Sequence, residues 1–336
     1  MDTAQRNSIF GLYDREDEAQ VHFIPVEWDA TTSYRRDARN GPGLILKESN
    51  QVDLYDHRVE SPETPGFFWT PCPPKIRSLN EKTRELYEKH IQSPTPSALE
   101  EANRNCEHLN EHVYEKTSAI LSSNKTPGIV GGDHSVSFGA IKAASEKYSN
   151  LGILHIDAHL DLRLAYQGFT YSHASIIRNV STRLDSVTKI AQIGIRDCCE
   201  EEIDYLESQG DRFMTVFDEN MQDDKAINSL SLYNKATEIA AFLPNDVWIT
   251  FDIDGLDPVL CPGTGTPVPG GLSFHEAKTI IFALVKSGKK IRGFDLVEVA
   301  ANENTDPEWN GNVGMRMLYI LSAYTLASQG LCRLRL

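Results

Sequence analysis

His155-Ile156-Asp157-Ala158-His159-Leu160-Asp161 is the stretch of sequence that decides the fold. The residues before it, Leu151-Gly152-Ile153-Leu154, are short and apolar enough for a buried strand of a parallel sheet. In an extended conformation Asp157, His159 and Asp161 share one face, because the side chains of a strand alternate between its two faces. The sequence therefore predicts a chelating cluster at the carboxyl end of a strand, where ligands bind in open α/β sheets.

Strands and helices are predicted to alternate along most of the chain. This alternation implies right-handed crossovers and a parallel sheet that is covered by helices on both faces. The helix at 97–121 begins with a capping-box pattern formed by Ser97 and Glu100. Further strands are predicted at 22–28, 128–130, 187–195, 212–217, 246–253 and 291–299, and further helices at 43–49, 200–209, 225–243, 273–287 and 314–328, with one more ending near 147.

We expect residues 1–336 to form a single domain, because a chain of this length can build one large α/β core. Residues 58–82 interrupt the alternation, since this segment is rich in proline and charge. We expect it to be an ordered excursion without regular structure, lying over a cavity mouth or an interface.

Composition excludes several classes of function. The formal net charge is −15, which argues against nucleic acid as a partner, because lysine and arginine carry the affinity for phosphates. No apolar run is long enough to span a membrane, and the first residues lack the pattern of a signal peptide. We therefore expect a cytoplasmic protein, and its acidity is compatible with a cationic substrate.

Three predicted strands end in residues that can bind metal. His134 alone is better explained as a turn residue, and an Asp-x-Asp pair alone can be a solvated loop. Three such ends in one sheet make a metal site the better interpretation. The complete set is His134, Asp157, His159, Asp161, Asp252 and Asp254.

The composition of this set indicates the kind of metal. Two imidazoles and four carboxylates without a thiolate suit hard or borderline divalent ions. Six ligands exceed what one ion takes from side chains, so we predict two ions that share carboxylates and activate a water molecule. With a hydroxide bound, such a site carries net negative charge, which suits a cationic electrophile better than a phosphate ester.

The motifs of the chain resemble those of the ureohydrolases, which include arginase, agmatinase, guanidinobutyrase and formiminoglutamase. The resemblance extends from about Ala30 to the C-terminus. It implies an α/β class protein with a three-layer α/β/α arginase-like fold, a mainly parallel eight-stranded sheet and two Mn²⁺ ions. The segments that carry it are Gly131–Ser135, Asp157–Asp161, Phe251–Pro258, Pro262–Pro267 and Gly270–Leu272.

The same resemblance implies a role for each ligand. His134 and Asp161 would bind one ion, and His159 and Asp254 would bind the other. Asp157 and Asp252 would bridge the two ions. Members of the family are commonly homotrimers or homohexamers, which is therefore the expected assembly.

The resemblance also implies three catalytic residues. His173, within Tyr171-Ser172-His173-Ala174-Ser175, matches a histidine that helps to transfer protons. Glu298 matches the glutamate that pairs with the substrate guanidinium, for which a carboxylate is a two-pronged partner. Asp161 would orient the attacking hydroxide and pass its proton to the leaving nitrogen.

Residues 161–173 and 32–42 look most like those of prokaryotic agmatinases, so the expected reaction is hydrolysis of agmatine to putrescine and urea. The residues that arginases use to hold an α-amino acid are missing after Asp161. A loop at 30–42 either faces a ligand or a subunit or is a solvated turn. Two departures from the agmatinase pattern are the segment 58–82 and residues 300–304.

Other interpretations stay open. A guanidinobutyrase, a guanidine hydrolase or a formiminoglutamase would use the same metal ligands. Arg163 keeps an anionic substrate in consideration, because it could pair with a carboxylate; a salt-bridged loop residue is the alternative. More remote alternatives are a metallophosphoesterase and a non-catalytic homologue.

Overall fold

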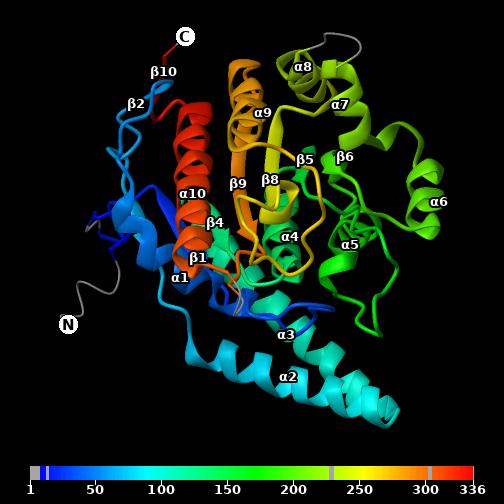
Figure 1. Ribbon diagram of the computed structural model, residues 1–336. Helices are drawn as coiled ribbons and strands as arrows, with labels where there is room; N and C mark the ends of the chain where they lie inside the picture. The colour runs from blue at the N-terminus through cyan, green and yellow to red at the C-terminus, as the bar shows by residue number, and fades with distance from the viewer. Residues whose placement is uncertain (1–7, 13–14, 227–230, 302–304, 336) are drawn as a thin grey trace.

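A computed structural model describes residues 8–12, 15–226, 231–301 and 305–335 (Figure 1). The main sheet contains β1 (Val21–Pro25), β3 (Phe67–Trp69), β4 (Thr126–Val130), β5 (Leu151–Ile156), β6 (Val187–Ile195), β7 (Phe213–Phe217), β8 (Asp246–Asp252) and β9 (Lys290–Val297). Their order is β3-β1-β4-β9-β8-β5-β6-β7, and neighbouring strands are parallel throughout. The predicted eight-stranded sheet is thus confirmed. A separate antiparallel pair joins β2 (Val59–Glu60) to β10 (Arg333–Leu334).

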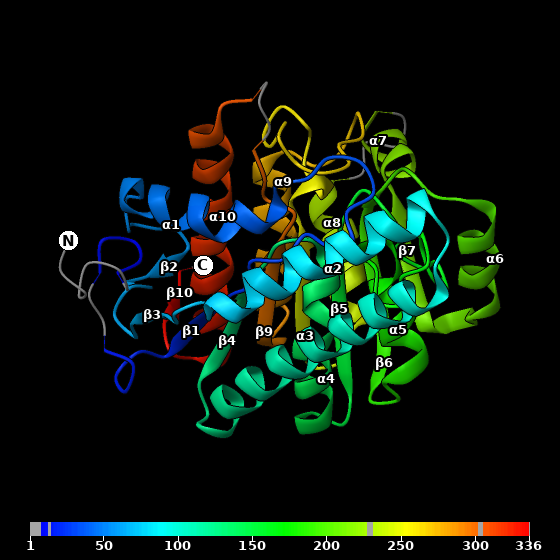
Figure 2. The ribbon, with the colours of Figure 1, turned by 90° about the horizontal axis from the view of Figure 1, so that it is seen from below.

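Helices cover both faces of the sheet, so the predicted three-layer architecture is also confirmed (Figure 2). One layer contains α1 (Gly41–Glu48), α8 (Leu232–Phe242), α9 (Phe274–Lys286) and α10 (Pro307–Gln329). The other contains α3 (Pro96–Ser122), α4 (Phe138–Lys147) and α5 (Ile176–Arg183), with α2 (Pro74–Gln92) packed along α3. Near the β6–β7 end of the sheet lie α6 (Glu200–Ser208) and α7 (Asp218–Ala226).

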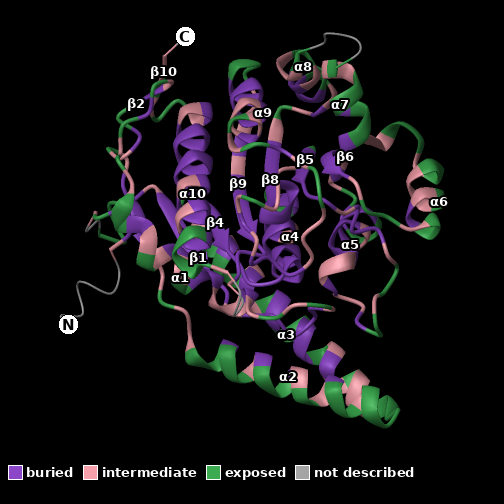
Figure 3. Cartoon of the chain, viewed as in Figure 1, coloured by how far each residue is buried: buried purple, intermediate pink, exposed green. Residues whose placement is uncertain are grey.

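The central strands are buried on both faces, as Figure 3 shows by their colour. On β5, Leu154 and Ile156 pack into the core beneath α9 and α10, whereas Leu151 and Ile153 pack into the core beneath α3 and α4. A strand between two helical layers needs apolar side chains on both sides. This requirement explains the continuous apolar run that begins at Leu151.

The sheet order brings the chemical motifs together. The four neighbouring strands β4, β9, β8 and β5 all end at the same edge, because they are parallel. The chain passes from β4 to β5 and only later fills the gap between them with β8 and β9. This reversal of strand order is the type of place where open α/β sheets bind ligands.

Residues 58–82 differ from the expectation, because they contain regular structure. They hold β2, the edge strand β3 and the first turns of α2. Pro73 and Pro74 begin α2 instead of preventing a helix. Proline is well tolerated at the first helical position, since its missing N–H would have no intrahelical partner there.

Two helix predictions also need correction. The predicted helix at 225–243 is divided into α7 and α8, and residues 227–230 between them lie outside the described part of the chain. The capping box of Ser97 and Glu100 is wrong, because α3 begins at Pro96 and the preceding Thr95 makes no side-chain cap. No helix among the described residues combines the length and the apolar character needed to cross a membrane.

Candidate active site

The motif that follows β5 forms a loop. The strand ends at Ile156, so the prediction that Asp157, His159 and Asp161 extend along one strand face is wrong. Asp161 has a φ of 55°, in the left-handed region that non-glycine residues rarely adopt. This turn brings two carboxylates to one imidazole: Asp157 Oδ2 and Asp161 Oδ2 each lie 3.1 Å from His134 Nδ1.

Asp157 lies between two clusters of metal-binding groups. Its Oδ2 faces His134, and its Oδ1 lies 3.4 Å from His159 Nδ1. Asp254 Oδ2 is 3.2 Å from the same His159 nitrogen. Asp157 belongs to both candidate metal-binding groups, as a carboxylate shared by two ions must.

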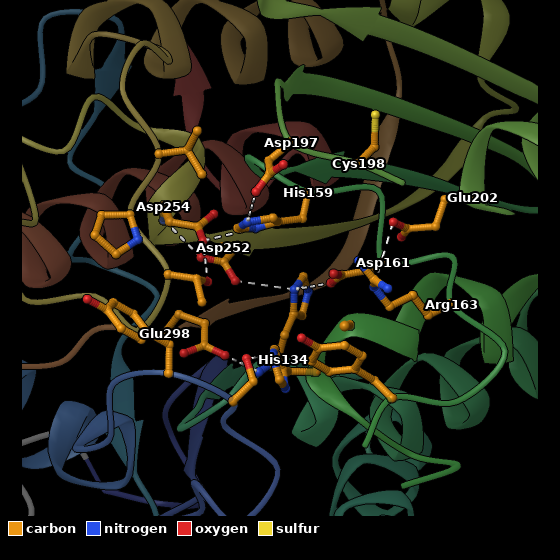
Figure 4. A pocket seen from close by; sticks show the side chains of 18 residues that line it. His134, His159, Asp161, Arg163, Asp197, Cys198, Glu202, Asp252, Asp254 and Glu298 are labelled. Carbon is orange, nitrogen blue, oxygen red and sulfur yellow. Dashed lines mark hydrogen bonds and ion pairs between the residues drawn. The ribbon is translucent and has the colours of Figure 1, made fainter. Parts of the chain in front are cut away.

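Asp252 approaches His134 from the side opposite Asp161 (Figure 4). Its Oδ2 lies 3.4 Å from His134 Nδ1, and its Oδ1 accepts a 2.8 Å hydrogen bond from the Asp254 N–H. This geometry places Asp252 with the His134 group, so its expected role as a second bridge stays a prediction.

Backbone N–H groups hold the carboxylates in place. Asp157 Oδ1 accepts from the His159 N–H at 2.6 Å, and Asp254 Oδ1 accepts from the Ala158 N–H at 3.1 Å. The second oxygen of each carboxylate faces an imidazole. The loops thus orient one oxygen of each carboxylate through backbone N–H groups.

The surroundings of His134 fit a metal ion. Its Nε2 is 2.8 Å from Thr250 Oγ1, and that hydroxyl donates its proton to Asp295 Oδ1 at 2.7 Å. Thr250 must therefore accept from the Nε2–H, which leaves a lone pair on Nδ1. Nδ1 is buried, has no hydrogen-bond partner among the described residues, and faces three carboxylate oxygens, so a cation is needed between them.

The pKa values point to the same need for positive charge. Burial opposes a charged His134, yet the carboxylates of Asp157, Asp161 and Asp252 that face it raise its pKa well above the usual value. Burial, together with the negative charge of Asp157, raises the pKa of Asp161 to about 6. Burial and neighbouring carboxylates also raise the pKa of Asp252 well above its usual range. Divalent ions would compensate these buried charges.

Glu298 follows β9 and reaches the same cavity. Its φ of 61° is also left-handed, and its Oε1 accepts a 3.0 Å hydrogen bond from the His134 N–H. Burial and the charge of Asp133 raise its pKa well above the usual value. No lysine or arginine pairs with Glu298 within the described ranges, although only 4% of the residue is exposed. A cationic ligand would supply the missing partner.

His173 lies across the cavity at the start of a short 3-10 helix, His173–Ser175. Its backbone N–H donates to Thr31 Oγ1 at 3.0 Å, and Thr31 in turn donates to Asp133 Oδ2 at 2.9 Å. Ser33 Oγ lies 3.3 Å from His173 Nε2. Burial and the charge of His159 lower the pKa of His173 to about 3, so this imidazole is neutral at pH 7.

A cavity of about 250 Å³ is lined by five of the six ligand candidates, all except Asp157, together with His173 and Glu298. The wall includes Ser33 and Tyr34, so part of the loop at 30–42 faces the cavity, whereas residues 58–82 contribute nothing to it. Sequence reasoning assigned no role to several lining residues, although Ala174 and Thr266 lie inside quoted motifs and Glu202 lies in the first turn of α6. The lining residues without an assigned role are Tyr166, Ala174, Asp197, Cys198, Glu202, Thr266 and Val268.

Comparisons with known proteins extend over nearly the whole chain. A model of the arginase family matches residues 19–320. An agmatinase of Bacillus anthracis is 31% identical over 288 residues, which are 85% of this chain and 84% of that protein. An N(1)-aminopropylagmatine ureohydrolase of Synechocystis is 28% identical over 284 residues, which are 84% of this chain and 82% of that protein. The crystal structure of agmatine ureohydrolase of Thermoplasma volcanium matches with a TM-score of 0.70 and 22% identity, covering 95% of this chain and 94% of that one.

Proposed function

The chain belongs to the arginase family, and on that premise we propose that it hydrolyses agmatine to putrescine and urea with two bound Mn²⁺ ions. One observation carries this proposal. A single cavity contains a carboxylate cluster around two imidazoles and a separate buried Glu298 that has no cationic partner among the described residues. The cluster suits metal ions, and the glutamate suits a guanidinium.

In the proposed site, His134 and Asp161 would hold one ion, His159 and Asp254 would hold the other, and Asp157 and Asp252 would contribute to both. When bound, the ions would activate a water molecule at neutral pH and offset the negative charge of the carboxylates. The lone pair of His134 Nδ1 and the two faces of Asp157 support this assignment.

In this proposal, side chains bind the substrate and transfer the protons. Glu298 Oε2 pairs with the substrate guanidinium, because Oε1 is held by the His134 N–H. Gly265 leaves room beside it, since a Cβ there would lie 3.2 Å from Oε2. The water oxygen bonds to the guanidinium carbon, and the carbon–nitrogen bond to the alkyl chain breaks. Asp161 takes the proton of the water and passes it to the leaving nitrogen, and His173 exchanges protons with solvent.

Agmatine is the first candidate because proteins named agmatinase are among the relatives with the highest identity. N(1)-aminopropylagmatine, which carries an additional aminopropyl group, is a related candidate, because other relatives are named as its ureohydrolases. Each ends in a positively charged amine, which the exposed Asp197 at the cavity wall could accept.

Arg163 favours a second candidate, a guanidino acid. Its Nε lies 3.8 Å from Glu202 Oε2, and its guanidinium lies over the Tyr166 ring at 4.7 Å. Both Glu202 oxygens already accept backbone N–H groups, from Leu162 and Cys199. Arg163 can therefore offer its outer nitrogens to a substrate carboxylate, and it would repel an amine.

A urea-release assay on Mn²⁺-loaded protein tests the proposal. The substrates are agmatine, N(1)-aminopropylagmatine, arginine, 4-guanidinobutyrate and guanidine, with formamide monitored from formiminoglutamate. We expect urea from agmatine at the highest kcat/KM. A higher kcat/KM for 4-guanidinobutyrate would identify a guanidino acid as the substrate. Release of formamide alone would contradict the proposal that the protein releases urea.

A further inference from the structure

A row of polar side chains, all buried except the half-buried Thr215, crosses the sheet directly beneath the candidate metal site. It contains one residue from each of five adjacent strands, and each is paired in register with the next. The row runs from β7 to β9 through Thr215, Gln192, His155, Thr250 and Asp295. Polar groups are costly inside an α/β core unless their hydrogen bonds are satisfied, so their place in five consecutive strands calls for an explanation.

We propose that this row, with His155 at its centre, positions Asp157 so that each carboxylate oxygen faces a different metal ion. His155 is a positioning residue in this account, acting on the metals through Asp157. The inference rests on the proposed two-metal site but not on the identity of the substrate.

Hydrogen bonds along the row have a fixed direction. Gln192 Nε2 donates to the Leu160 carbonyl at 2.9 Å, and Gln192 Oε1 accepts from Thr215 Oγ1 at 3.0 Å. A carbonyl can only accept, so the amide cannot be flipped. The same Nε2 lies 3.0 Å from His155 Nδ1, which must therefore carry a lone pair.

The proton of His155 is thus on Nε2, which lies 2.8 Å from Asp157 Oδ2. His155 has no exposed surface, so water cannot compete for this bond. Although His155 is close to His134 and Asp161, its protonated Nε2 has no lone pair for a metal. The geometry therefore favours a hydrogen-bond donor over an additional ligand.

Asp157 is consequently held by two donors, one for each oxygen. The His159 N–H bonds to Oδ1, and the His155 Nε2–H bonds to Oδ2. A carboxylate oxygen has two acceptor positions, so each oxygen keeps one for a metal ion. On the neighbouring strand β8, Thr250 accepts from His134 Nε2 and directs Nδ1 toward the same site.

The test compares Mn²⁺ binding in His155→Phe and His155→Gln. Phenylalanine keeps a ring but removes the donor, whereas glutamine can place an amide N–H near the position of Nε2. His22→Phe is the matched control, because His22 is a buried histidine on β1 outside the row. Metal analysis gives the affinity, and electron paramagnetic resonance distinguishes a coupled Mn²⁺ pair from isolated ions. Circular dichroism verifies that each variant is folded.

We expect His155→Phe to weaken Mn²⁺ binding by about 10- to 100-fold, the effect typical of losing a group that orients a ligand. Its spectrum should change from that of a coupled pair to that of isolated ions. His155→Gln should recover most of the affinity and the coupled spectrum, and His22→Phe should match the wild type.

Unchanged affinity and coupling in His155→Phe would overturn the inference, and so would equal losses in His155→Phe and His155→Gln. If His155→Phe does not fold, Gln192→Leu removes the donor that fixes the His155 tautomer and must show the same weakened binding and uncoupled spectrum. A wild-type protein that binds no Mn²⁺ pair would instead contradict the proposed two-metal site itself.

Discussion

The inner end of the cavity and its mouth are built in different ways. At the inner end, Asp157 is 1% exposed and Glu298 is 4% exposed, and backbone N–H groups hold both carboxylates. At the mouth, Tyr34 is 72% exposed, and the side chain of Asp197 is 66% exposed. Backbone geometry therefore fixes the inner groups, whereas the far end of the proposed substrate would meet exposed side chains.

This difference follows from the sheet. The inner groups come from the ends of four neighbouring strands, β4, β9, β8 and β5, whose positions are set by the core. The mouth is made of loops around 33–34, 163–166, 197–198 and 266–268, with Glu202 from the first turn of α6. Loops tolerate substitution far better than packed strands, so substrate choice can change there while the chemistry stays the same.

Substitution at the inner end should have the largest effect. Asp157→Asn removes the charge shared by the two proposed ions and should cost several kcal/mol of transition-state stabilisation. This corresponds to a loss on the order of 10⁴-fold in kcat/KM, with fewer Mn²⁺ ions per chain. Asp197→Asn at the mouth is the control and should keep its metal. Full turnover in Asp157→Asn would show that the reaction does not depend on the inner end more than on the mouth.

Glu298→Gln should separate substrate binding from metal binding. The amide cannot balance a guanidinium charge, so we expect a loss of about 2–5 kcal/mol. That is roughly 30- to 5,000-fold in kcat/KM, measured by urea release. The number of Mn²⁺ ions per chain should not change. Normal kcat/KM in this variant would show that Glu298 does not hold the substrate.

His173→Ala should lower kcat by about 10²-fold, as expected when a group that transfers protons is lost. The effect should fall on kcat more than on KM, because His173 is placed to exchange protons and Glu298 to bind. Added imidazole should restore part of the rate. A change confined to KM would instead assign His173 to substrate binding.

Arg163→Gln should have the smallest effect, because its partly exposed charge is screened by water. We expect the ratio of kcat/KM for agmatine to that for 4-guanidinobutyrate to rise by a few fold, corresponding to about 0.2–1 kcal/mol. Removing the cation relieves repulsion of an amine and takes away the partner of a carboxylate. Arg77→Gln, outside the cavity, is the control. An unchanged ratio would show that Arg163 does not contribute to substrate specificity.

The sequence predicted that the ligand candidates lie at strand ends on one edge of the sheet, because their motifs are local, and the structure brings these residues together. Asp252 and Asp254 lie at the end of an apolar strand, and parallel strands bring such ends to one edge. The left-handed turns at Asp161 and Glu298 could not be predicted, since only the packed loops enforce them. His155 was also missed, because its partner Gln192 is identified only by the register between β5 and β6.

The regular structure in 58–82 was missed for a different reason. Prolines discourage a helix interior, but Pro74 occupies the start of α2, where proline is tolerated. Likewise, Ser97 and Glu100 have the spacing of a capping box, yet the helix begins one residue earlier at Pro96. Local patterns identify element types more reliably than their ends.

The most direct test of the central claim is a titration of chelator-treated protein with Mn²⁺, with the rate of urea release recorded at each number of ions per chain. The account predicts that the rate reaches its plateau at two ions per chain. A plateau at one ion, or no urea from any guanidino compound at two, would contradict it.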